Sequence, residues 1–64
     1  MEHKIKDIKR AIKMAEDRRA ELKEFSVKQF ENRNYNESAL LDQQARSVEI
    51  YANGLKRALE IIEE

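Results

Sequence analysis

The sequence predicts an all-α fold, an antiparallel hairpin of two long helices that dimerises into a four-helix bundle. Apolar residues recur with helical periodicity in both halves of the chain, and one turn-like cluster of asparagines separates the halves. The 64 residues include no proline and one glycine, and 41% of them are charged. This composition is typical of long helices with solvent-exposed sides, and a chain of this length forms a single domain.

The first helix is predicted over residues 2 to about 33. Its apolar side chains fall within about a third of the helical wheel at about 100° per residue. Lysine and glutamate, both good helix formers, fill much of the remainder. The apolar positions are Ile5, Ile8, Ala11, Ile12, Ala15, Leu22 and Phe30.

A turn is predicted at about residues 33–38. Asn32, Asn34 and Asn36 cluster there, and asparagine both tolerates a left-handed backbone and caps helix starts. Asn34 stands three residues before Glu37, which is the spacing of a capping box. Asn36 and Ser38 are alternative caps, so the start of the second helix is open by two or three residues.

The second helix is predicted over about residues 37–63, and its apolar residues repeat every seven positions. Leu41, Val48, Leu55 and Ile62 form one row, and Ala45, Ala52 and Leu59 form a second. Two such rows describe a helix seam that packs against another helix. Gly54 does not interrupt the helix, because both rows continue through it in phase.

The charge distribution favours an antiparallel arrangement of the two helices. Residues 1–13 carry five basic and two acidic residues, whereas residues 36–64 carry three basic and six acidic residues. Each helix alone therefore opposes its own macrodipole. In a hairpin the basic start lies beside the acidic end, and a turn centred near residue 35 places Ala15 opposite Leu55 and Leu22 opposite Val48.

Polar residues interrupt this predicted seam at two levels. Arg19 is expected opposite Tyr51 and Ala52, where it either sets the register of the two helices, stacked on the tyrosine ring, or contacts an anionic ligand. Ser26, Gln29 and Gln44 are expected to form a second polar layer nearer the turn.

A further stripe on the second helix is left uncovered by the hairpin, and we expect it to form a dimer or partner interface. Exposure of such a stripe in a monomer would create a large apolar patch, which soluble monomers rarely show. A symmetric homodimer is the expected solution, and a different protein partner is the alternative. The stripe comprises Leu40, Ser47, Ile50, Tyr51, Gly54, Ala58 and Ile61.

The residues needed for catalysis are missing from the sequence. His3 is the only histidine, there is no cysteine, and Ser26, Ser38 and Ser47 have no plausible base. We therefore expect no enzymatic activity, no metal, no cofactor and no small-molecule substrate. The apolar runs are too short to span a membrane and charged residues surround Ile5, so we expect no signal peptide and a cytoplasmic location.

The predicted function is that of a small protein-interaction module, a regulator, inhibitor or adaptor that binds itself and another protein. Chains this short without catalytic groups are typical of bacterial or phage regulators. The alternative is a nucleic-acid-associated accessory protein, for which a basic stripe on the first helix would contact phosphates. That stripe comprises Lys6, Lys9, Arg10 and Lys13.

Overall fold

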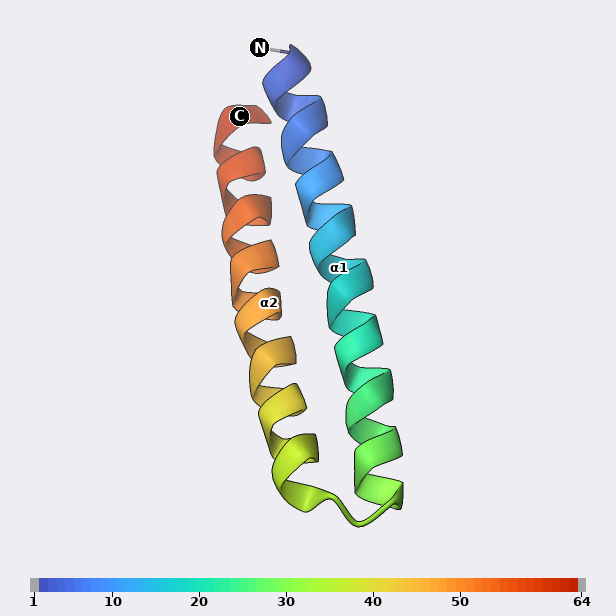
Figure 1. Cartoon of the computed structure of the whole chain (residues 1–64). Helices are drawn as coiled ribbons and strands as arrows, with labels where there is room; N and C mark the ends of the chain where they lie inside the picture. The colour runs from blue at the N-terminus through green and yellow to red at the C-terminus, as the bar shows by residue number, and fades with distance from the viewer. Residues whose placement is uncertain (1, 64) are drawn as a thin grey trace.

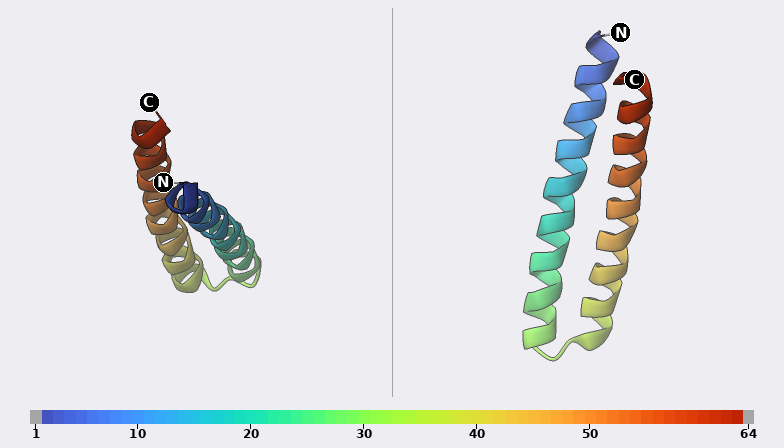
Figure 2. Two further views of the ribbon diagram at one scale, coloured as in Figure 1. Left: turned by 90° about the horizontal axis from the view of Figure 1, so that it is seen from above. Right: turned by 180° about the vertical axis from the view of Figure 1, so that it is seen from behind.

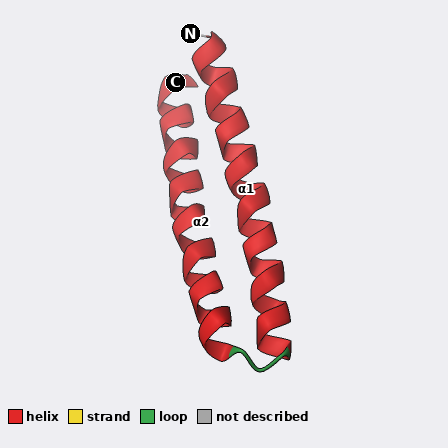
Figure 3. Cartoon of the chain, viewed as in Figure 1, coloured by secondary structure: helices red, strands yellow, loops and turns green. Residues whose placement is uncertain are grey.

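The computed structural model describes residues 2–63, which form two helices joined by a short linker (Figure 3). Helix α1 spans Glu2–Glu31 and helix α2 spans Tyr35–Glu63. The helices lie side by side and antiparallel, so the start of α1 and the end of α2 lie at the same end of the molecule (Figure 1). The molecule measures 48 × 14 × 11 Å. The predicted all-α helical hairpin is confirmed.

The linker is shorter, and lies earlier in the chain, than the predicted turn at residues 33–38. Helix α1 ends in a Schellman motif, in which the Asn34 N–H donates to the Gln29 carbonyl at 2.8 Å and the Arg33 N–H donates to the Phe30 carbonyl at 3.0 Å. Arg33 has φ of 64°, the left-handed conformation that this motif requires. The left-handed residue is thus an arginine, although the asparagine cluster led us to expect an asparagine.

Asn34 ends one helix and begins the next. Its carbonyl accepts the first hydrogen bond of α2 from the Ser38 N–H at 3.0 Å, while its side-chain Nδ2 donates back to Gln29 Oε1 at 2.8 Å. The side chain therefore ties the linker to the end of α1. Because Asn34 is the cap, α2 starts at Tyr35, two residues before the predicted start.

The seam between the helices is narrow and contains mostly small residues. The described residues that it buries are Ile12, Ala15, Leu22, Ala45 and Ala52, together with the hydroxyl side chains of Ser26 and Ser38. The two predicted rows on α2 face α1 over most of their length, but Leu41, Val48, Leu55 and Leu59 are only half-buried and Ile62 is exposed. Each helix contacts the other along one stripe only, so its remaining sides face solvent; the two further views show the two helices side by side (Figure 2).

The pairing of residues across the seam differs from the prediction near the linker. With the reversal centred at Arg33, Ser26 lies beside Ser38, their Oγ atoms 3.0 Å apart, and Lys23 Nζ lies 3.4 Å from Asp42 Oδ1. At the open end Lys9 pairs with Glu63, as the predicted approach of basic start and acidic end requires. The predicted turn centre near residue 35 was two residues too late, and this moved the expected partners near the turn.

Candidate interaction surface

One broad face of the hairpin carries a ladder of cross-helix ion pairs, which we call the ion-pair face. On α2 the partners recur every seven residues, so they lie on one side of the helix. Opposite charges meet at each level, at N–O distances of 3.3–3.7 Å. The pairs are Lys9–Glu63, Glu16–Lys56, Arg19–Glu49 and Lys23–Asp42.

These pairs are solvent-exposed, so each contributes little to the free energy of folding. Their main effect is on specificity, because charges that flank a helix seam select partner and orientation. Sequence reasoning did not identify this ladder. The sequence does contain a pattern that indicates the ladder: charged residues recur every seven positions beside the apolar rows, at Asp42, Glu49, Lys56 and Glu63.

The opposite side of the molecule exposes several large apolar side chains, and we call it the apolar face. The row Leu40, Ser47, Gly54 and Ile61 precedes the charged row on α2 by two residues, so it lies about 200° around the helix from that row. Helix α1 adds Met14, which is 65% exposed, and Phe25, which is 47% exposed. The apolar face therefore extends from α1 across α2.

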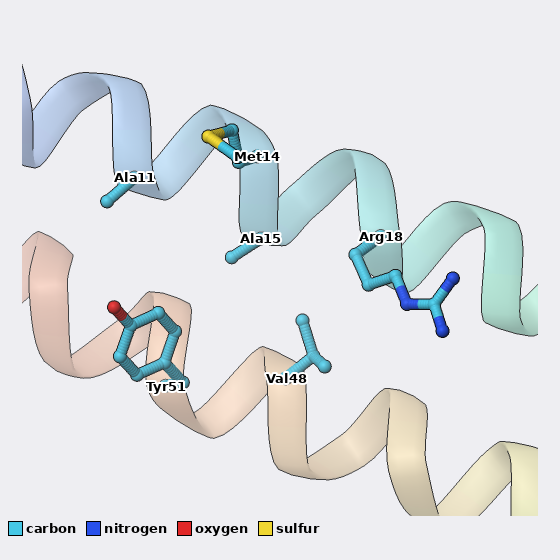
Figure 4. A pocket seen from close by; sticks show the side chains of 6 residues that line it. All are labelled: Ala11, Met14, Ala15, Arg18, Val48 and Tyr51. Carbon is cyan, nitrogen blue, oxygen red and sulfur yellow. The ribbon is translucent and has the colours of Figure 1, made fainter.

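A hollow of about 330 Å³ lies on this face between the two helices (Figure 4). Ala11, Met14, Ala15 and Arg18 line it from α1, and Val48 and Tyr51 line it from α2. The small side chains of the two alanines leave the space, and the Tyr51 ring stands at its edge, 59% exposed. An apolar side chain of a partner fits such a hollow.

The seven residues expected to form an interface remain accessible in the monomer, with only Ala58 half-buried. Ile50 is 66% exposed and Ile61 is 56% exposed. The Ser47 hydroxyl donates to the Gln43 carbonyl of its own helix at 3.2 Å, so its burial under a partner leaves no donor unpaired. A partner can therefore cover this surface without leaving the Ser47 hydroxyl unpaired.

Gly54 has no structural role within the hairpin. It lies inside α2 without a positive φ, and a Cβ atom at this position would meet nothing within 4 Å. A glycine in a helix interior costs about 0.5–1 kcal/mol relative to alanine. The hairpin itself therefore gives no reason for a glycine at this position.

Arg19 lies on the ion-pair face and not beside Tyr51 as predicted. Its Nε atom is 3.6 Å from Glu49 Oε2, and this Nε is buried without a hydrogen-bond partner. Ala52 lines the same depression, as expected, whereas Tyr51 borders the hollow on the apolar face. The predicted stacking of Arg19 on Tyr51 is therefore wrong, and Arg19 takes part in the ion-pair ladder.

A polar cluster is buried in the seam near the linker. Ser26 Oγ lies 2.7 Å from Asp42 Oδ1, 3.0 Å from Ser38 Oγ and 3.1 Å from the Ser38 carbonyl. A hydroxyl has one proton, and the nearest and only charged acceptor is Asp42, so Ser26 donates to Asp42 and accepts from Ser38. The predicted layer is only partly correct, since Gln29 bonds to Asn34 instead and Gln44 is exposed.

This cluster shifts the protonation of Asp42. The hydrogen bond from Ser26 lowers the pKa of Asp42 below its ordinary value of 3.8. Partial burial opposes this effect, and the nearby cations Lys23 and Arg46 reinforce it. Asp42 thus stays ionised and links the buried cluster to the ion-pair face.

The basic stripe considered for nucleic-acid binding is exposed on α1 but partly neutralised. Lys9 pairs with Glu63 across the helices, and Lys13 Nζ lies 3.7 Å from Asp17 Oδ2 on its own helix. Two of the four cations, Lys9 and Lys13, therefore already face carboxylates. The other two are Lys6 and Arg10.

Among the described residues, no group of three or more histidine, cysteine or acidic side chains is placed to hold a metal ion. Within residues 2–63 neither helix is long and apolar enough to cross a membrane. In comparisons with known proteins, no family model, no curated protein and no solved structure matches the chain.

Proposed function

We propose that this protein is a small cytoplasmic, non-enzymatic interaction module that dimerises into a four-helix bundle and acts as a regulator, inhibitor or adaptor. The observation that carries the proposal is the contrast between the two faces. Ion pairs link the helices on one face, whereas the other exposes Met14, Phe25, Leu40, Ile50 and Tyr51. An apolar area of this extent on a soluble chain indicates a protein contact.

The exposed area supports a partner of substantial size. The chain exposes 5372 Å². A compact monomer of its mass of 7.6 kDa exposes about 4,300 Å². Covering the excess of about 1,100 Å² on each of two copies buries about 2,200 Å² in total, which falls in the range of obligate homodimers. The elongated hairpin therefore has enough surface for a contact of the size that a stable dimer needs.

The small core supports the same proposal. Alanines predominate among the buried apolar side chains, and Leu22 is the largest well-buried one, at 4% exposure. Chains below about 70–80 residues seldom gain enough stability from one core without a disulfide, a metal or oligomerisation. The sequence contains no cysteine. Oligomerisation supplies the missing burial.

Sedimentation of the wild type and of Gly54→Glu over a range of concentrations tests the proposal. We expect the wild type to be dimeric and Gly54→Glu to dimerise at least about tenfold more weakly, because a carboxylate buried without a partner costs more than about 1.4 kcal/mol. Asn53→Glu is the matched control, since it adds the same charge at the exposed neighbouring position and is expected to leave the dimer intact.

The helicity of Gly54→Glu should equal or exceed that of the wild type, because glycine is the poorer helix former. A wild type that stays monomeric at high concentration would contradict the homodimer and assign the apolar face to a different protein. Affinity purification of the tagged protein from its native cell, followed by mass spectrometry, would then identify that protein.

The alternative function, nucleic-acid association, depends on Lys6, Lys9, Arg10 and Lys13. We favour it less, because Lys9 and Lys13 already pair with carboxylates. A salt titration of binding to generic duplex DNA separates the two functions, since phosphate contacts give affinity that falls steeply with salt. Tight, strongly salt-dependent binding would support this alternative.

A further inference from the structure

We infer that two copies of this chain pack α2 against α2 in antiparallel orientation, about a two-fold axis that passes between Ile50 and Tyr51. The inference rests on the proposed function, because it names the occupant of the apolar face and the geometry of the contact. A second copy is the occupant for three reasons, which concern side-chain size, the flanking residues and charge.

The first reason is that the exposed row on α2 is palindromic in side-chain size. Leu40, Ser47, Gly54 and Ile61, spaced seven residues apart, read large, small, small, large in both directions. In an antiparallel pair, Leu40 meets Ile61 of the partner subunit and Ser47 meets Gly54 of the partner subunit. A two-fold contact joins one surface to itself, so a self-complementary row is what it requires.

The small residues lie on both sides of the axis, where two crossing helices come closest. A Cβ on Gly54 would touch nothing in its own chain, and the Ser47 hydroxyl is satisfied within its helix. Both positions are therefore free to let a second backbone approach. The antiparallel contact accounts for a glycine that the monomer does not need.

The second reason is the placement of the residues that flank the row. Ile50 and Tyr51 lie about 50° to either side of it on the helical wheel. About the inferred axis, Ile50 meets Ile50 of the partner subunit, and Tyr51 meets Tyr51 of the partner subunit. The side of α2 that carries Tyr51 faces Met14 and the hollow on the apolar face. In the inferred dimer, the α1 helices of the two subunits therefore complete the four-helix bundle on that side.

The third reason is electrostatic. Two ion pairs beside the apolar face form within single helices, Arg18–Glu21 at 3.2 Å and Arg57–Glu60 at 3.3 Å, so these four side chains bring no net charge to the contact. A parallel arrangement would place the acidic carboxyl ends of both α2 helices side by side with aligned macrodipoles. The antiparallel arrangement separates these ends and opposes the macrodipoles.

Single-cysteine variants test this geometry, since the natural sequence has no cysteine. In the inferred dimer the two copies of position 40 are about 30 Å apart, at 1.5 Å per residue, and too far for a disulfide. Leu40→Cys and Ile61→Cys are therefore expected to stay at monomer mass when oxidised separately. Mixed together, they are expected to form a disulfide-linked dimer.

Ile50→Cys, which lies beside the axis, is expected to form a disulfide with its own copy. Ala20→Cys is the matched control, because Ala20 is exposed on α1 away from the apolar face, and it should remain at monomer mass. Circular dichroism of each variant verifies that helicity is retained, and sedimentation of each reduced variant verifies that it still dimerises.

The outcomes separate this inference from the proposed function. Disulfide formation by Leu40→Cys alone would show a parallel dimer, which overturns the axis while the interaction module stands. A dimer in sedimentation that gives no disulfide with Ile50→Cys or with the mixture would place the contact elsewhere and overturn the inference. A monomeric wild type would overturn both the axis and the proposed homodimer.

Discussion

Replacement of Arg33 by glycine is expected to stabilise the protein. Arg33 has φ of 64° and forms the Schellman motif at the end of α1. A residue with a Cβ atom adopts this left-handed conformation at a cost of about 1–2 kcal/mol, and glycine avoids it. Glycine also loses more conformational entropy on folding, which costs about 0.5–1 kcal/mol. The net gain in the free energy of unfolding is about 0.5–1 kcal/mol.

For a domain of this size, such a gain raises the melting temperature by about 4–7 °C. Thermal and urea unfolding, followed by circular dichroism, measure the change. Wild type and variant must be compared at one protein concentration, because association makes the melting temperature depend on concentration.

Two control variants separate the backbone effect from loss of the arginine charge. Arg33→Ala keeps a Cβ atom and should change stability by less than about 0.5 kcal/mol. Asn32→Gly places glycine at a neighbouring position without a positive φ and should destabilise by about 0.5–1 kcal/mol. If Asn32→Gly stabilised the protein and Arg33→Gly did not, the left-handed residue would be misassigned and our account of the linker would fail.

Two further predictions concern the buried polar cluster. Ser26→Ala should destabilise the protein by about 1–3 kcal/mol in urea unfolding, because it removes a hydrogen bond to a carboxylate and leaves the buried Ser38 hydroxyl without its partner. Asn53→Ala, at an exposed polar position outside the proposed dimer contact, should be near neutral, and equal effects of the two changes would contradict the burial of the cluster. Because the pKa of Asp42 is lowered on folding, its stabilising contribution is present above pH 3.8 and is lost as the pH falls through the lowered pKa. The stability difference between wild type and Asp42→Asn should therefore shrink on acidification below about pH 4. Asp17→Asn is the control for removal of one negative charge. A stability difference that did not change with pH would refute the role of Ser26 in holding the ionised carboxylate.

The sequence alone determined the two helices and their antiparallel pairing. Helix hydrogen bonds join residues four apart, so local composition and periodicity decide whether a helix forms. The rows through Ala45, Ala52 and Leu55 predicted the side of α2 that faces α1, and they predicted that α2 continues through Gly54. The same periodicity predicted the stripe from Leu40 to Ile61, which the structure leaves exposed.

The tertiary structure alone decided which side chains meet across the seam. The chain reverses at Arg33, although three nearby asparagines suit a left-handed backbone better, and this choice placed Ser26 against Ser38 and Asp42. It also placed Arg19 with Glu49 on the ion-pair face, away from Tyr51. Pairing next to the linker depends on the residue at which the chain turns, because a shift of one or two residues there changes which side chains meet in the adjoining turns of both helices. Helical periodicity contains no information about that residue.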